Sequence, residues 1–491
     1  MAARKKAFYI IPGAYSMIGI GTIFRRRAGS GGPLPPDYAK WVKEHMVFWY
    51  DMTKSVDVYT QNFNDWQNYN PNSVSITNNK IVVNGLIDNF RIASIGKETE
   101  SFSVFIEGLG DKNLVYRVKL DENSDQITNI KLKDGENVLP HSFATTVAFM
   151  GVSGVTDYIG LTITQLPSGQ SVPTNEILKA NPYLQDFSGN NRPLKLNNFL
   201  FAAMSGVGGY DISSTNILSD RANVTVTDNR IIHITKKLST TDNMVNIVPS
   251  NSNPTHKFKV TGLSDGRQVS LVNRNGGFYT FDNGEHEVTL TYPEGTTSLY
   301  NAIGVTGDIG DMDVTIEFLP KYPNALVTDG VDDYGVVENF KSLQNYMMFF
   351  QCAIIRLNTA KGMFSTTPIE SSTPGWMLLQ GQSANSVRFG NNVYTNFEFT
   401  PSVEDKISYV LSANNKLMTC YVGEEKATLA GTYGQTGANM SLFLSDMIRK
   451  TRFGSMAFYK SILFDSVPTK ETDGFTEQDL INYVLENIIT Q

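Results

Sequence analysis

Three aspartates stand close together in the stretch LVTDGVDDYGVV, from Leu326 to Val337. Clustered carboxylates can hold Ca²⁺, but a calcium site gathers about six to eight oxygens from several loops. Asp329-Gly330 is typical of a turn, and Val331–Val337 is expected to form a strand whose period of two places Asp332 and Asp333 on opposite faces. Few oxygens would then converge at one point. The stretch therefore predicts the start of a strand and no metal site, with a calcium or sugar contact as the alternative.

Carboxyl pairs that hydrolyse glycosidic bonds have no counterpart in this sequence at the expected Glu-x-Asp-x-Glu spacing. The nearest pairs are Glu98 with Glu100 and Asp311 with Asp313, both in turn-like contexts. The five histidines form neither an HExxH motif nor a Ser/His/Asp arrangement, and the GxSxG-like GVSGV at residues 151–155 recurs later as GVTGD. Glycoside hydrolysis needs two carboxyl groups flanking one bond. We therefore expect no enzyme activity, no catalytic residue and no cofactor.

Composition places the chain among folded, β-rich proteins. Its 491 residues are 41% hydrophobic and 18% charged, enough core material for about two to four domains. A formal net charge of −7 argues against a protein that coats nucleic acid. Cys352 and Cys420 lie in apolar, strand-like runs without zinc-site spacing. They are expected to be buried, which favours folding in a reducing compartment.

The first 36 residues form a distinct arm. Arg4, Lys5 and Lys6 precede 18 uncharged residues, and Arg25, Arg26 and Arg27 follow them. A secretory signal would end in a small-residue cleavage site instead of three arginines. A membrane span would sit at the lower length limit and would be positive at both ends. We interpret the arm as an anchor to another protein, ahead of a membrane segment or internal packing, with no membrane span expected.

An internal repeat lies behind the arm. GVSGVTDYIGLTITQLP at residues 151–167 matches GVTGDIGDMDVTIEFLP at residues 304–320 without a gap. Upstream, SVSITNNKIVVNG at residues 73–85 matches NVTVTDNRIIHIT at residues 223–235. Each copy reads as short strands separated by tight turns. The repeat therefore predicts two discrete small antiparallel β-sandwiches.

Three segments outside the repeats have a pattern of their own. They are VFWYD, which contains Asp51; the run from Asp186 to Phe199; and DGVDDY, from Asp329 to Tyr334. In this order they resemble consecutive parts of concanavalin A-like (laminin G-type) jelly-roll domains common in proteins of Bacteroidales and their phages. The resemblance implies one jelly roll that is interrupted twice. Near the end of the chain, Thr476 and Asp479 predict a capping box at the start of a short helix.

The expected fold class is therefore all-β: a concanavalin A-like jelly-roll sandwich interrupted by two homologous small β-sandwich inserts, with an N-terminal anchoring arm and a short C-terminal helix. The predicted boundaries are an arm and linker at 1–36, a discontinuous jelly roll at 37–58, 172–211 and 324–491, a first insert at 59–171 and a second insert at 212–323.

Aromatic side chains in polar, Asn- and Gly-rich surroundings are candidates for stacking on a sugar ring. Five residues meet this description: Trp66, Tyr69, Trp376, Tyr394 and Tyr433. The competing interpretation is that such rings cover a sandwich edge or an oligomer contact, because solitary apolar surface residues are common.

The architecture resembles fibre proteins of crAss-like and related Bacteroides phages. This resemblance implies a structural virion protein, made in the host cytoplasm and fixed to the capsid or another virion protein by the arm. We expect a head fibre, forming a dimer or trimer, that adheres to host polysaccharide and binds no nucleic acid. The alternatives are a tail-fibre receptor-binding protein and a glycan-binding surface protein of the bacterium.

Overall fold

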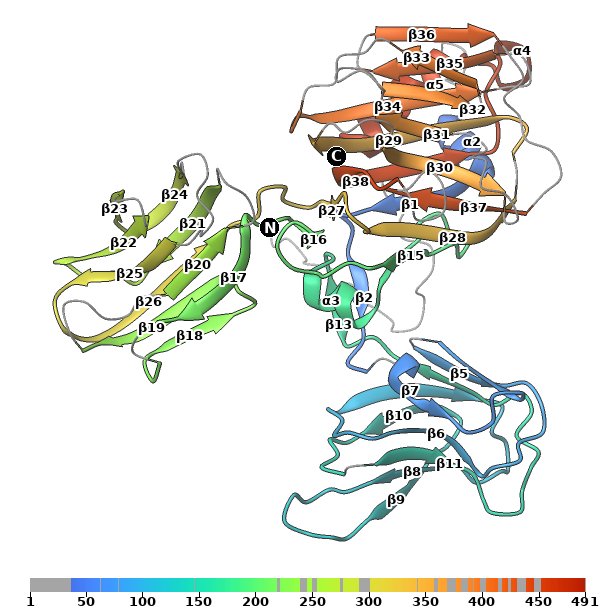
Figure 1. The fold of residues 1–491 in the computed structure, drawn as a ribbon. Helices are drawn as coiled ribbons and strands as arrows, with labels where there is room; N and C mark the ends of the chain where they lie inside the picture. The colour runs from blue at the N-terminus through green and yellow to red at the C-terminus, as the bar shows by residue number, and fades with distance from the viewer. Residues whose placement is uncertain are drawn as a thin grey trace, which may run out of the picture. The chain divides into compact units, whose positions relative to one another are not determined.

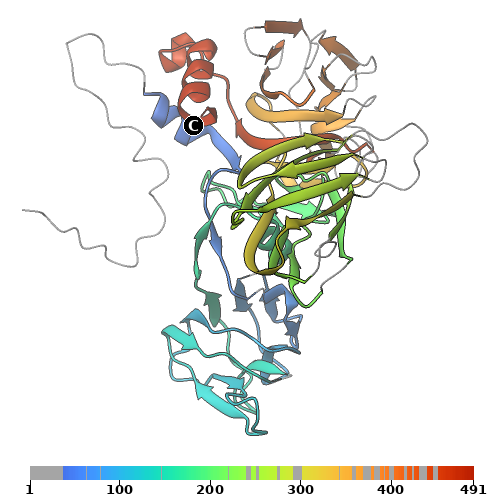
Figure 2. The ribbon, with the colours of Figure 1, turned by 90° about the vertical axis from the view of Figure 1, so that its left-hand side faces the viewer.

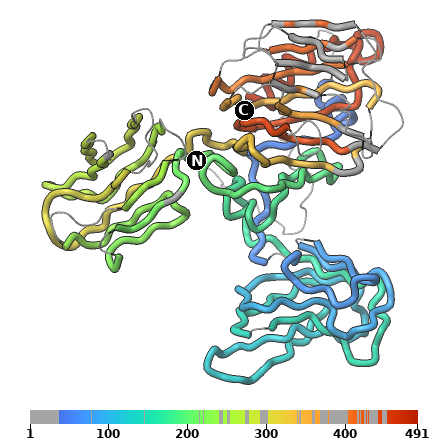
Figure 3. Tube along the Cα trace, in the orientation of Figure 1, coloured from blue at the N-terminus to red at the C-terminus, as the bar shows by residue number. Residues whose placement is uncertain are grey.

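The computed structural model describes most of the chain beyond the arm. Within residues 37–490, the segments left undescribed are 62, 78, 145, 219–220, 239–244, 250–253, 274–276, 291–300, 342, 357–360, 369–376, 381–386, 392, 398–402, 414–416, 423–424, 431–438 and 446–451 (grey in Figure 3). The predicted anchoring arm, with its six basic residues, lies outside the described residues. Antiparallel strands dominate the described chain, so the predicted all-β class is confirmed. None of the helices in this part is long and apolar enough to cross a membrane.

The largest sandwich consists of two antiparallel sheets (Figure 1). The first sheet follows the order β16 (Gly206–Val207), β27 (Leu326–Asp329), β38 (Ser455–Phe464), β29 (Tyr346–Arg356), β34 (Lys406–Ala413), β35 (Leu417–Val422) and β36 (Glu425–Ala430), with β1 (Met46–Asp51) also paired to β38. The second follows β14 (Tyr183–Leu184), β15 (Leu194–Asn197), β28 (Tyr334–Lys341), β37 (Asn439–Leu444), β30 (Gly362–Pro368), β31 (Met377–Gln380), β32 (Val387–Asn391) and β33 (Val393–Phe397).

Aromatic side chains fill the space between these sheets. Phe350 of β29 lies 5.5 Å from Phe364 of β30 and 5.5 Å from Phe458 of β38, measured between ring centroids. Alternate residues of β29 therefore face the second sheet. All ten residues of β38 are nevertheless buried, so its other face must also be covered.

Helices at the two ends of the described chain provide part of that cover. α2 (Tyr38–His45) and α5 (Glu477–Val484) lie side by side (Figure 2) and share one apolar cluster with the outer face of the first sheet. The rings of Tyr38 and Tyr483 stack with their centroids 4.9 Å apart. The predicted capping box of Thr476 and Asp479 at the start of α5 is confirmed. A π-helical turn at Leu485–Ile489 follows α4 (Lys470–Asp473) and α5.

Two smaller sandwiches have the same strand order. In the first insert, the sheets follow β3 (Gln67–Asn68), β6 (Arg91–Ile95), β11 (Val147–Met150), β8 (Val115–Val118) and β9 (Thr128–Lys131), and β10 (Gly135–Leu139), β7 (Phe102–Glu107), β12 (Thr162–Gln165), β5 (Lys80–Val83) and β4 (Val74–Ile76). In the second insert, they follow β17 (Ile212–Ile217), β20 (Val245–Pro249), β25 (Asn301–Gly307), β22 (Arg267–Asn273) and β23 (Phe278–Phe281), and β24 (Gly284–Thr289), β21 (Thr255–Thr261), β26 (Gly310–Phe318), β19 (Ile231–Lys237) and β18 (Val224–Thr227). Each strand of one insert thus has a counterpart in the other.

A glycine at the same place in both repeats shows why the two copies fold alike. Gly108 and Gly262 have φ values of +76° and +85°, which favour glycine. A Cβ atom would lie 2.3 Å from the carbonyl oxygen of Gly160 in the first insert and 1.8 Å from that of Asp313 in the second. Those two carbonyls also align in the sequence repeat. Both copies therefore depend on the same close backbone approach.

Each insert has two chain connections that pair with one another. At the ends of the first insert, β2 (Val56–Val58) pairs with β13 (Gly169–Ser171), and these strands, with α3 (Asn175–Ala180), belong to a compact unit that runs from Thr53 to Tyr183. At the second insert, Gly208–Tyr210 runs beside Pro320–Tyr322, held by backbone hydrogen bonds. We call this second pair the second stem.

Candidate functional site

The acidic stretch of the sequence forms a bend between two strands. β27 ends at Asp329 and β28 begins at Tyr334, so the expectation of a strand from Val331 is wrong. Asp329 Oδ1 accepts hydrogen bonds from the backbone N–H groups of Val331 at 2.7 Å and Asp332 at 3.3 Å. Side-chain acceptors of this kind compete with strand pairing for the backbone donors.

Asp333 closes the bend from inside. Its Oδ2 accepts from the backbone N–H of Asp329 at 3.0 Å, and its Oδ1 accepts from the hydroxyl of Ser205 at 2.9 Å. Burial, with smaller contributions from the charges of Asp329 and Asp332, raises the pKa of this carboxyl to about 7, although both hydrogen bonds act to lower it. Asp333 therefore joins the bend to Ser205, directly before β16.

The same three carboxylates lie close enough together to be considered as a cation site. One oxygen from each of Asp329, Asp332 and Asp333 lies within 4.8 Å of the others. Two of the three already accept hydrogen bonds from protein donors. Because Ca²⁺ takes about six to eight oxygens, three carboxylates in this state fit a structural bend better than a calcium site.

The other aspartates of the jelly-roll motif also have structural partners. Asp51 Oδ2 lies 3.4 Å from Nζ of Lys460, with both side chains almost fully buried, and that Nζ donates to the carbonyl oxygen of Ile488 at 3.3 Å. Asp186 accepts from the backbone N–H of Trp49 at 3.0 Å and of Arg192 at 3.0 Å. A buried ion pair needs such additional hydrogen bonds to offset desolvation.

The carboxylate pairs considered for hydrolysis lie at exposed positions. Asp311 and Asp313 of β26 lie 3.1 Å from Lys236 and 2.7 Å from His233, and Glu100 lies 3.5 Å from His141. These are ordinary surface contacts. Cys352 and Cys420 are buried as predicted, and burial raises the pKa of both thiols, that of Cys420 to about 12.

Trp66 does not lie on the surface. Its side chain is 4% exposed and its ring stacks on Phe149 with centroids 5.1 Å apart, inside the core of the first insert. The expectation that Trp66 contacts a glycan is therefore wrong, because a buried ring offers no face to a ligand.

The remaining aromatic candidates divide into two groups. Tyr69 is half-buried, its hydroxyl accepts from Arg91 and Ser94 at 3.1 Å each, and the Arg91 guanidinium lies 5.0 Å from the ring centroid. One face of that ring is already taken by a cation. Trp376 and Tyr433 lie outside the described residues, and Tyr394 is described only as part of the backbone of β33.

An open groove at the edge of the second insert was not predicted from the sequence. It has a volume of about 600 Å³ and lies where the edge strands β17 and β18 meet, so we call it the edge groove. Its polar lining is Thr215, Asn216, Arg221 and Asn229. Its apolar lining is Ile217, Leu218 and Val226. The Thr215 hydroxyl donates to Oδ1 of Asn229 at 3.0 Å, which fixes the two strands relative to one another.

The first insert is closed at the equivalent edge. Asn68 of β3 pairs with the core residue Ala93 of β6, and its side-chain amide donates to the carbonyl oxygen of Val74 at 2.7 Å, across the gap between β3 and β4. Asn70, two residues later, is buried and donates to the carbonyl oxygens of Asn89 and Arg91 at 3.0 and 3.1 Å.

In the second insert, Leu218 directly follows β17 and is 56% exposed, whereas Asn70 in the corresponding connection of the first insert is buried. The segment that joins the two edge strands is also longer by one residue: Leu218–Asn223 replaces Tyr69–Ser73. This difference in length is the sequence signal for the groove. It becomes visible only after the strands of the two repeats have been paired one to one.

Comparisons with known proteins give only distant similarities. No protein-family model matches the chain, and no curated protein sequence matches it. Domain 4 of AbnA, a GH43 extracellular arabinanase from Geobacillus stearothermophilus, is 16% identical over 32% of this chain and 80% of its own, with a TM-score of 0.24. The CBM40 of a Ruminococcus gnavus sialidase is 14% identical over 27% of this chain and 81% of its own, with a TM-score of 0.23. Trypanosoma rangeli sialidase is 11% identical over 61% of this chain and 59% of its own, with a TM-score of 0.26. Similarity at these TM-scores carries no conclusion about function.

Proposed function

We propose that this chain is a structural fibre protein of a phage virion that adheres to carbohydrate on the host surface. In this proposal, residues 1–36 fix the protein to the capsid or to another virion protein, and the β-sandwiches project as rigid adhesive modules. Attachment to the head is preferred over attachment to the tail, following the resemblance of the jelly-roll segments.

The edge groove is the observation that carries the adhesive part of the proposal. Small-molecule sites occupy clefts of about 300–1,000 Å³ with a few placed polar groups, and the edge groove is within that range. Its lining contains two amides, a hydroxyl and a guanidinium, which suit the hydroxyl-rich surface of a saccharide. Its lining contains no carboxyl pair among the described residues, so the groove is suited to binding rather than to hydrolysis.

A single groove of this kind would bind weakly. An affinity near 1 mM corresponds to about −4 kcal/mol, and joining several copies raises the effective affinity by about 10²–10⁴. Adhesion through a weak site therefore requires an oligomer or many copies on one particle.

The attachment part is tested by deleting residues 1–28. The truncated protein should fold and stay in solution, yet should be missing from purified particles examined by electron microscopy and protein gels. Normal incorporation of the truncated chain would rule out the arm as the anchor. Detection of the full-length protein on the bacterial surface, independent of particles, would favour the surface-protein alternative.

The adhesion part is tested separately with particles that carry the protein. Particles should adsorb to host cells, and an excess of the purified oligomeric protein should compete with that adsorption. Equal adsorption by particles with and without the protein would reduce its role to a spacer.

A further inference from the structure

Charge distinguishes the edge groove from a general carbohydrate surface. Arg221 is the one charged residue among the described residues that line it. Its side chain is exposed and makes no hydrogen bond or ion pair to any other described residue. A guanidinium presents a planar fork of donors that matches a carboxylate. The described lining of the groove thus carries one positive charge, on a chain whose formal net charge is −7.

Neutral donors and acceptors stand beside this cation. The amide of Asn216 is exposed on β17, and the amide of Asn229 follows β18, with its Oδ1 already accepting from the Thr215 hydroxyl. This contact uses only the amide oxygen of Asn229, so its Nδ2 can donate to a ligand. Vicinal hydroxyls of a sugar ring can accept from one amide and donate to the other.

The apolar residues of the lining provide a wall for the C–H face of a sugar ring. Ile217 and Val226 are half-buried, and Leu218 is 56% exposed at the rim. Partial burial of these side chains by a ligand would be favourable at about 25 cal/mol per Å² of apolar surface.

An extended peptide fits this edge less well. β17 and β18 each have a single neighbour within their own sheets, so each has a free edge. The two strands also contact one another across the sandwich edge. A further strand inserted between them would have to displace that contact, whereas a ligand bound through side chains would not.

We infer that the edge groove of the second insert binds a saccharide that bears a carboxylate, a uronic or sialic acid residue, with Arg221 receiving the carboxylate and Asn216 and Asn229 receiving ring hydroxyls. The first insert does not share this activity, because Asn68 and Asn70 close its equivalent edge. This inference rests on the proposed adhesive function and names its ligand class and site.

Two matched pairs of probes test the inference on the full-length protein. Trigalacturonate is compared with galactotriose, and sialyllactose with lactose, in ligand-observed NMR titrations. The acidic member of at least one pair should bind more tightly than its neutral partner. Arg221→Ala should weaken that binding about 10- to 100-fold, since a hydrogen bond to a charged group is worth about 1.5–3 kcal/mol. Asn216→Trp, which fills the groove, should abolish it.

The control is Lys259→Ala, which removes the same charge from an exposed position on β21, in the same insert and away from the groove lining. Binding by this variant should equal that of the unaltered protein, and all three variants should keep the melting temperature of the unaltered protein.

Equal binding of acidic and neutral probes, or full binding by Arg221→Ala, would overturn the inference. Adhesion would then have to use another surface. Failure of both acidic probes to bind would also overturn the inference. The proposed adhesive function would still be decided separately, by the adsorption of particles to host cells. If the protein instead binds a peptide tightly, and Asn216→Trp abolishes that binding, the ligand of the groove is a peptide and the inference of a saccharide is wrong.

Discussion

The backbone N–H of Lys321 donates to the carbonyl oxygen of Gly209 at 2.8 Å, so the chain enters and leaves the second insert through paired backbone. The N–H of Tyr322 donates in the same way to the carbonyl oxygen of Gly208 at 2.7 Å. A Cβ on Gly208 would lie 2.6 Å from Cβ of Pro320, which explains why glycine stands here. The second stem is therefore closely packed and its two ends are adjacent.

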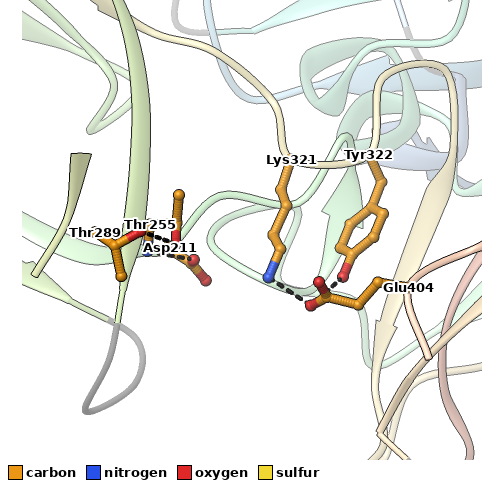
Figure 4. Close-up of polar contacts among 6 residues, drawn as sticks. All are labelled: Asp211, Thr255, Thr289, Lys321, Tyr322 and Glu404. Atoms are coloured by element: carbon orange, nitrogen blue, oxygen red, sulfur yellow. Dashed lines mark hydrogen bonds and ion pairs between the residues drawn. The ribbon is translucent and has the colours of Figure 1, made fainter. Parts of the chain in front are cut away.

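Polar contacts secure the return segment of the second stem. Lys321 Nζ and the Tyr322 hydroxyl both donate to Oε1 of Glu404, at 2.7 and 3.2 Å, as Figure 4 shows. On the insert side, Asp211 accepts from the backbone N–H of Thr255 at 3.2 Å (Figure 4). From these contacts we expect the junction with the insert to lie between Asp211 and Pro320.

The first prediction is that the second insert is dispensable for folding of the jelly roll. Deleting Ile212–Leu319 and joining the ends with a short Gly/Ser linker should leave a soluble protein with a cooperative unfolding transition, because the paired ends of the stem remain. Tryptophan fluorescence and circular dichroism during thermal unfolding provide the measurement. A matched deletion of the same length, from Val224 to Val331, removes β27 and should not fold. An insoluble or non-cooperative product from the first deletion would show that the boundary predicted near residues 211 and 324 is not a domain junction.

The sequence predicts the local backbone conformation correctly where an internal repeat or a helix-capping motif determines it. Aligning the repeats places Gly108 over Gly262, and the structure gives both the same positive φ and the same close carbonyl contact. The Thr476 and Asp479 pair predicted a helix start because both partners of a capping box lie within one turn.

The sequence was misleading where a distant contact decides the conformation. Trp66 has polar neighbours, yet its ring stacks on Phe149, far along the chain. Local composition cannot specify which side chain of a polar loop turns inward. The alternation after Asp329 suggested a strand, but Asp333 and Ser205 bond across sequence-distant segments and delay its start to Tyr334.

The second prediction concerns the repeated glycine. Gly262→Ala should destabilise the second insert by about 2–4 kcal/mol, because a positive φ and a steric clash with the Asp313 carbonyl act together. Hydrogen exchange of peptides from β21 and β26, followed by mass spectrometry, measures the loss. Gly284→Ala is the matched control: its φ is +134°, but the nearest atom to a new Cβ is 4.0 Å away. Its effect should be clearly smaller, and equal effects would mean that the close approach does not constrain the fold.

The third prediction concerns Asp333. Burial raises the pKa of its carboxyl to about 7 in the folded protein, whereas an unfolded aspartate titrates near about 3.9. Between these pH values the folded chain holds a proton that the unfolded chain has lost, so this group makes stability fall as pH rises from about 4 to 7. Asp333→Asn removes that dependence and can still accept from Asp329 N–H and donate to Ser205.

Urea unfolding of Asp333→Asn at several pH values between 4 and 8 tests this linkage. The stability of the variant relative to the unaltered protein should improve steadily as pH rises through the window. Asp332→Asn, at an exposed position in the same bend, serves as the control and should show a much weaker trend, because its charge is the smallest cause of the raised pKa of Asp333. A constant difference between Asp333→Asn and the unaltered protein at all pH values would contradict the raised pKa.

The last prediction concerns His256, in β21 of the second insert. Its ring is 2% exposed, lies 5.7 Å from the ring of Phe318, and has a pKa lowered by burial to about 4. An unfolded histidine titrates near about 6.5, so between about pH 6.5 and 4 the unfolded chain binds a proton that the folded chain does not. The stability of this insert should therefore fall with decreasing pH, by at most about 3.5 kcal/mol at about 1.4 kcal/mol per pKa unit. His256→Leu should remove that fall. Hydrogen exchange in β21 and β26 should then depend less on pH, after correction for intrinsic exchange rates.

The control is His286→Gln, in β24 of the same sheet. This variant leaves the buried imidazole of His256 in place and should therefore retain the acid sensitivity. If His256→Leu loses protection in acid as steeply as the unaltered protein, His256 is not the group that limits acid stability of the second insert.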